Sequence, residues 1–134
     1  MIKWPITYKD YNDNEITEDF YFNLNKAELT KMQFDANGAY SEYIERIKNE
    51  RNIKLLGEEF KNLILMSYGQ KSDDGKVFRK NQQIRDDFEN SEAYSELFMT
   101  LISDEAQASK FVTGILPKDL QNSVNIPNTL ELAE

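Results

Sequence analysis

Acidic residues are the most numerous side chains in this sequence that could do chemistry. The 134 residues include 24 Asp and Glu, but neither Cys nor His. Their absence excludes thiolate nucleophiles, disulfides, zinc–thiolate sites and Ser-His-Asp triads. Carboxylates, Lys, Tyr, Ser and Thr are left for catalysis, and paired carboxylates can hydrolyse glycosides or phosphoesters.

Three acidic pairs could serve such a reaction: Asp73-Asp74, Asp86-Asp87 and Asp104-Glu105. Each has a plainer structural role. The first pair precedes a glycine in a turn, the second lies on the polar side of a predicted helix, and the third complements the positive end of a helix dipole.

Two ligand-binding motifs fail on inspection. The run Asp10–Asn14 starts like an EF-hand loop, but Glu15 and Tyr21 stand where that loop needs Gly and Glu. The five glycines form no phosphate-binding loop. We therefore expect a protein that is not an enzyme and that binds no cofactor and no metal.

The charge and hydropathy of the chain limit its partners. The net charge of −8 argues against binding to a nucleic-acid backbone, which needs a basic surface. The hydrophobic share of 40% is too high for disorder, and the longest apolar stretch, Leu63–Met66, is too short to span a membrane. We expect a soluble cytoplasmic protein with no membrane or nucleic-acid partner.

The alternation of apolar and polar residues predicts an N-terminal β-hairpin over residues 1–24, with Pro5 on an edge strand. Asn25 and Glu28 have the spacing of a capping box, which predicts a helix over Lys26–Phe34.

Helical periodicity follows over most of residues 39–115. One predicted helix carries an apolar stripe that could be a core face or an intermolecular seam: Tyr40, Tyr43, Ile44 and Ile47. The next runs from about Leu56 to Tyr68, with Gly69 as a left-handed C-terminal cap. Residues 76–80 are either a short extended piece or a structured loop. Three more helices begin near Asn81, at Ser91, and at Ser103 or Asp104.

These elements predict a mainly α fold of the α+β class, a small helical domain with an N-terminal β-hairpin. Residues 1–117 form a single domain, with the helical part over 25–117, and residues 118–134 form a loose C-terminal tail.

Three separated motifs resemble one protein family. Ser67-Tyr-Gly-Gln-Lys-Ser-Asp-Asp-Gly75 is followed by Ala93-Tyr-Ser-Glu-Leu-Phe98 and then by Phe111-Val-Thr-Gly-Ile-Leu-Pro117. In order and spacing they are similar to the tail assembly chaperones of long-tailed, siphovirus-type bacteriophages. The resemblance covers Leu56–Pro117, a little under half of the chain.

The resemblance implies a small chaperone that binds the tape-measure protein and keeps it soluble while the tail tube polymerises around it. It implies work in the cytoplasm of the infected bacterium, absence from the mature virion, the tail-tube protein as a further partner, and in some members a longer frameshifted form. Self-assembly into a homo-oligomer stays open.

Aromatic residues on helical faces have two interpretations, as core and as surface that holds an apolar partner. We expect both roles among six residues: Phe60, Ile64, Tyr68, Tyr94, Phe98 and Phe111. Four residues of the matched motif are expected to serve turn geometry instead: Gly69, Asp74, Gly75 and Phe78.

A second hypothesis is a small acidic inhibitor or DNA mimic of a phage or mobile element. It requires carboxylates spaced like phosphates on one face, whereas the 24 acids divide equally between the residues before Tyr68 and those from Tyr68 onward. A carboxylate-only hydrolase is a third option, and no acid spacing favours it.

Overall fold

A computed structural model describes residues 1–35 and 53–118. The described elements follow one another in this order: β1 (Ile2–Lys9), β2 (Glu15–Phe22), α1 (Lys26–Asp35), α3 (Ile53–Ser67), β3 (Tyr68–Lys71), β4 (Phe78–Arg79), α4 (Gln82–Glu89), α5 (Glu92–Ser103) and α6 (Glu105–Gly114). The predicted α+β class is confirmed. The predicted helix with Tyr40, Tyr43, Ile44 and Ile47, and the tail from residue 119, lie outside the described residues.

The predicted N-terminal hairpin is present, and its register places Ile2 opposite Phe22 and Lys9 opposite Glu15. Its turn is held by Asp10, whose side chain accepts from the backbone N–H of Asn12 and Asn14, both at 2.9 Å. Strand β1 is the edge of the sheet, so Pro5 lies where a missing N–H is tolerated.

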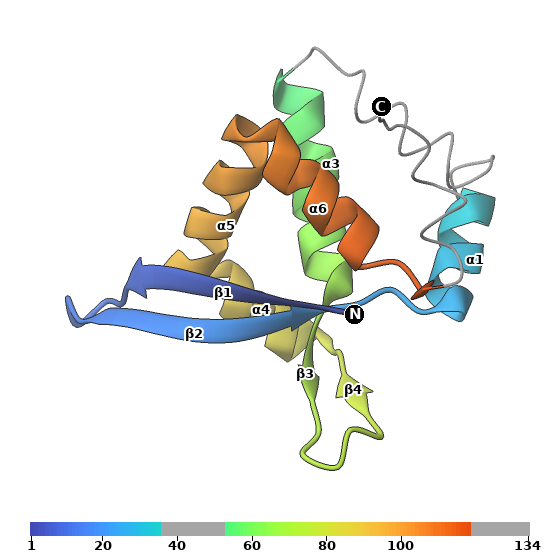
Figure 1. The fold of residues 1–134 in the computed structure, drawn as a ribbon, viewed down its shortest axis with the longest axis horizontal. Coiled ribbons are helices and arrows are strands. Elements are labelled where there is room, and N and C mark those ends of the chain that lie inside the picture. The colour runs from blue at the N-terminus through green and yellow to red at the C-terminus, as the bar shows by residue number, and fades with distance from the viewer. Residues whose placement is uncertain (36–52, 119–134) are drawn as a thin grey trace.

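Helices cover one face of this hairpin. In Figure 1, α5 and α6 lie on one side of β1 and β2, and the β3–β4 hairpin extends beyond the other side. Helix α5 packs across β1, and α6 packs against α5. The main-chain N–H of Leu24 donates to the Ile115 carbonyl at 2.7 Å, which joins the end of the hairpin to the end of α6.

The helix N-termini carry the side-chain caps that their sequences predict. Asn25 and Glu28 exchange the two reciprocal bonds of a capping box at 2.8 and 2.9 Å. Side chains of Asn81, Ser91 and Asp104 accept from the backbone at the starts of α4, α5 and α6. Asp104, one of the two predicted candidates, is thus the cap of the last helix.

The prediction for the end of α3 was wrong. The helix ends at Ser67, and Tyr68 and Gly69 belong to β3, which pairs with Phe22 and Tyr21 and extends the hairpin into a four-stranded sheet. Gly69 is not a left-handed cap, because Gly75 is the described glycine with a positive φ. A Cβ on Gly69 would lie 2.7 Å from the Phe78 ring and 2.9 Å from the Arg79 carbonyl oxygen, so close approach of β4 requires glycine here.

Instead of a glycine cap, α3 has partners for all four carbonyls of its last turn. The Ser67 hydroxyl is shared between the Leu63 carbonyl at 2.6 Å and the Ile64 carbonyl at 3.2 Å, and the Arg85 guanidinium donates to the Leu65 carbonyl at 3.2 Å. Lys80 Nζ donates to the Met66 carbonyl, and the Asn23 main-chain N–H donates to Ser67, both at 2.8 Å. Besides the helix itself, the main chain after β2 and the β4–α4 region are therefore bound to one helix end.

Lys80 extends this junction to α1. Its ammonium also donates to the Asn23 carbonyl at 2.7 Å and to Glu28 Oε2 at 2.8 Å, so its three protons have three oxygen acceptors. Burial lowers the pKa of Lys80, and the Glu28 carboxylate opposes that shift. The same Glu28 closes the α1 capping box through Oε1.

We expect Lys80→Met to lower the free energy of unfolding by about 2 kcal/mol, because the Asn23 and Met66 carbonyls and Glu28 Oε2 lose this donor. Urea unfolding of the full chain measures the change. Lys76→Met, at an exposed turn position, is the matched control and should change stability by less than about 0.5 kcal/mol. Equal losses of stability in the two variants would contradict the stabilising role of the Lys80 hydrogen bonds.

We expect Gly69→Ala to destabilise the fold by about 1–3 kcal/mol, the usual range for overpacking. The same substitution at Gly57, inside α3, places its Cβ 3.4 Å from Phe98 in ordinary contact. Gly57→Ala should stabilise by roughly 0.5 kcal/mol through helix propensity. Thermal unfolding measures both variants, and the midpoint temperature should fall for Gly69→Ala and rise for Gly57→Ala.

Candidate partner-binding surface

Four of the six predicted contact residues lie in the hydrophobic core. Ile64 and Phe111 are fully buried, and Phe60 and Tyr68 are 4% and 8% exposed. The Tyr68 ring stacks on Phe88 with centroids 4.2 Å apart. In this structure these four residues serve packing and present almost no surface to a partner.

The other two predicted residues, Tyr94 and Phe98, lie at the boundary between core and solvent on α5. Both are partly exposed, and their ring centroids are 5.9 Å apart. Ile102 continues the line at the same four-residue spacing, and Met99 beside it is 58% exposed. We call Tyr94, Phe98, Met99 and Ile102 the α5 strip.

Helix α3 borders this strip. Gly57 has no side chain, and the Phe98 ring lies over the space where one would be. Leu56, one residue earlier, is partly buried and packs against the core. The α5 strip is therefore supported from below by packed residues and is open on its outer side, as a preformed binding surface must be.

Charges lie close to one end of the strip. Lys61 on α3 pairs with Glu89 of α4, with Nζ and Oε2 3.0 Å apart. Burial raises the pKa of Tyr94, and the Glu89 carboxylate raises it further. The Tyr94 phenol therefore stays neutral at physiological pH and acts as an amphipathic contact group.

The four predicted turn residues lie together in the β3–β4 hairpin, away from the α5 strip (Figure 1). Gly75 has a φ of 76°. Asp74 accepts from the Lys76 main-chain N–H at 3.0 Å and from the Ser72 hydroxyl at 2.7 Å, and these bonds lower its pKa. Phe78 covers Gly69.

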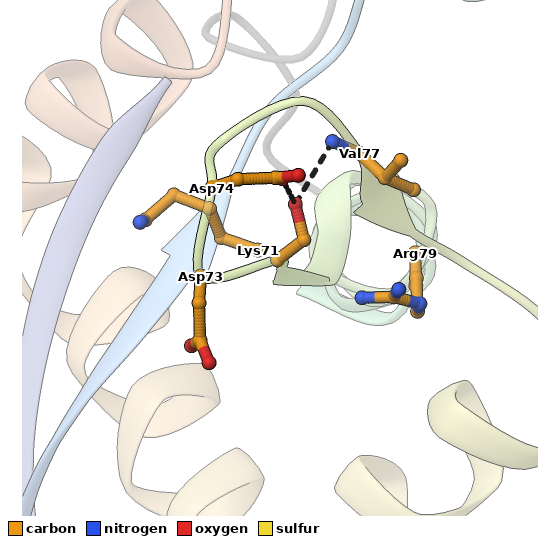
Figure 2. A pocket seen from close by; sticks show the side chains of 6 residues that line it. Lys71, Asp73, Asp74, Val77 and Arg79 are labelled. Carbon is orange, nitrogen blue, oxygen red and sulfur yellow. Dashed lines mark hydrogen bonds between the residues drawn. The ribbon is translucent and has the colours of Figure 1, made fainter.

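This hairpin contains a shallow pocket, lined by Lys71, Ser72, Asp73, Asp74, Val77 and Arg79. Figure 2 shows the Ser72 hydroxyl bonded to both Asp74 and the Val77 N–H, which fixes the loop. Side chains of both charge signs line the pocket. They favour no single class of ligand, so the pocket is a weaker candidate site than the α5 strip.

Within residues 1–35 and 53–118, no group of three or more acidic side chains could hold a metal ion. In the same part of the chain, no helix is long and apolar enough to cross a membrane.

A family model described as phage tail assembly chaperone matches residues 1–131, almost the whole chain. The chain belongs to the phage tail assembly chaperone family. The match includes the N-terminal hairpin, which lies outside the motifs that suggested the relationship. No curated protein and no solved structure matches the chain.

Sequence reasoning missed two residues of this chaperone's strip, Met99 and, as a surface residue, Ile102. Met99 lies outside the apolar stripe of α5 that periodicity assigned to the core. An apolar residue off that stripe could have been recognised from the sequence as exposed. An exposed Met on an otherwise polar helix face is adaptable contact surface.

We expect the strip to tolerate substitutions that the core does not. Phe88→Ala removes a ring that is 4% exposed and should cost about 3–5 kcal/mol of stability. Phe98→Ala should cost about 1–2 kcal/mol because its ring is only partly buried, and Met99→Ser less than about 0.5 kcal/mol. Urea unfolding monitored by circular dichroism separates the three. A Phe98→Ala loss as large as that of Phe88→Ala would make Phe98 a core residue.

Proposed function

We propose that this chaperone binds the tape-measure protein and keeps it soluble while the tail tube assembles. The observation that carries the proposal is the α5 strip, an exposed apolar surface with rings that are already held in place, on a member of the tail assembly chaperone family. A long helical client exposes apolar stripes before the tube covers them, and such stripes aggregate unless they are masked.

The charge of the chain supports this role. A net charge of −8 keeps a complex dissolved when part of its surface is apolar. A strip of four residues gives modest affinity, and several copies along one client would add their effects while each copy can still leave. Release is required because the tube must replace the chaperone.

The proposal includes a place and a fate. The chaperone acts in the cytoplasm of the infected bacterium, contacts the tail-tube protein when it is displaced, and is absent from the mature virion. Its work is binding without a chemical step, and self-association of the chain is compatible with it.

The direct test is co-expression with the long helical tape-measure protein of the same phage. We expect the client to move from the pellet to the soluble fraction and to co-purify with the chaperone. The double variant Phe98→Ala with Met99→Ser should lose most of this effect while keeping its circular dichroism spectrum.

Val77→Ser is the matched control, since Val77 is 48% exposed but lies on the β3–β4 hairpin, away from the strip. It should solubilise the client as the natural chain does. A client that stays insoluble with the natural chain would refute the proposed function. Equal activity of the double variant and the control would place the holding surface elsewhere.

A further inference from the structure

The negative charge of this protein is concentrated in the segment of the chain that contains the α5 strip. Residues 82–105 contain seven carboxylates and a single basic residue, Arg85, which gives this segment a net charge of −6 out of −8 for the chain. The carboxylates are Asp86, Asp87, Glu89, Glu92, Glu96, Asp104 and Glu105. The acidic residues are equally numerous before Tyr68 and from Tyr68 onward, so their number in each half does not reveal this concentration.

The one basic residue of this segment is already counted in that net charge, and it is bound at the end of α3. The Arg85 guanidinium donates to the Leu65 carbonyl at the end of α3, so it is used inside the fold. Glu89 has Lys61 as a partner. Glu92 and Glu96 are exposed and have no ion-pair partner among the described residues.

Helix geometry places these free carboxylates next to the strip. At about 100° per residue, Glu92 and Glu96 follow Met99 around the exposed side of α5, on the flank away from Phe98. Asp104 and Glu105 lie just past the C-terminal end of the strip, and Glu89 lies near its N-terminal end. Exposed acidic groups thus lie beside Met99 and just past the C-terminal end of the strip, while Glu89 at the N-terminal end is paired with Lys61.

We propose that the α5 strip binds an amphipathic helix of the client whose apolar face is flanked by Lys or Arg. The apolar residues at positions 94, 98 and 102 have the spacing that receives a helix face. Carboxylates around them favour a basic helix and disfavour an acidic one by charge repulsion. This inference rests on the proposed function, because it names the chemistry of the client segment that the chaperone holds.

Two synthetic 18-residue helical peptides with the same Leu and Ala face test the proposal. One carries Lys at the flanking positions and the other Glu, and fluorescence anisotropy measures their binding to the full chain. At about 0.1 M salt we expect the Lys peptide to bind at least about tenfold more tightly, as two or three exposed ion pairs provide. At about 1 M salt the preference should largely disappear.

Matched variants show which carboxylates cause the preference for the Lys peptide. Glu92→Gln with Glu96→Gln should reduce the preference for the Lys peptide about threefold or more. Asp13→Asn with Glu15→Gln, at the hairpin turn, removes the same charge elsewhere and should leave the preference unchanged. Phe98→Ala with Met99→Ser should weaken the binding of both peptides.

The outcomes separate this inference from the proposed function. Equal binding of the two peptides, no binding of either, or equal effects of the two charge variants would overturn the inference even when co-expression keeps the client soluble. An insoluble client together with a clear preference for the Lys peptide would refute the proposed function and leave the strip's preference for basic helices intact.

Discussion

The C-terminal end of α3 is the point on which the rest of this fold depends. Four carbonyls with no helical partner meet there, and burying them unpaired would be expensive. They are satisfied by a serine of the same turn, by cations from the β4–α4 region and by the main chain after β2. Because β3 starts at the very next residue, this junction also sets where the sheet can continue.

That junction explains how the strip on α5 can be rigid in a small protein. Lys80 and Arg85 lie at either side of the start of α4, so binding them to α3 fixes α4 against the sheet. Phe88 on α4 then stacks on Tyr68 and meets Tyr94 edge-on, with ring centroids 6.0 Å apart. The strip is thereby connected to the junction through a continuous set of packed rings, which lowers the entropic cost of presenting it.

The local features of this fold were predictable and the long-range ones were not. Caps such as Asn25, Asn81 and Ser91 act within three residues, so their bonds can be read from spacing. The hairpin shares that property, since its register follows from alternation and a short turn. The prediction that Tyr68 ends a helix and Gly69 caps it was wrong, because the conformation of both residues is decided by residues distant in sequence. These are Phe22, Phe78 and Phe88.

The same distinction applies to the candidate surface. Periodicity identifies an apolar face but does not say whether another element covers it, so Phe60 and Phe98 looked equivalent in the sequence. Their difference arises from which helices surround each ring. Tyr94 and Phe98 stay partly exposed because they lie on the edge of the α5 face that packs on β1, whereas Leu97 lies at its centre.

The composition of the chain has a physical meaning in this arrangement. The proposed function requires a surface that binds an apolar helix but releases it again, and a chain that lacks Cys has no thiol with which to bond a client covalently. Charge around the strip serves both requirements. In the proposed complex it raises the rate at which a basic helix is captured, keeps free copies apart, and adds little to the lifetime of the complex because exposed ion pairs are weak. In the proposed function, apolar contact over a few residues limits affinity to a level at which polymerising tube subunits can displace the chaperone.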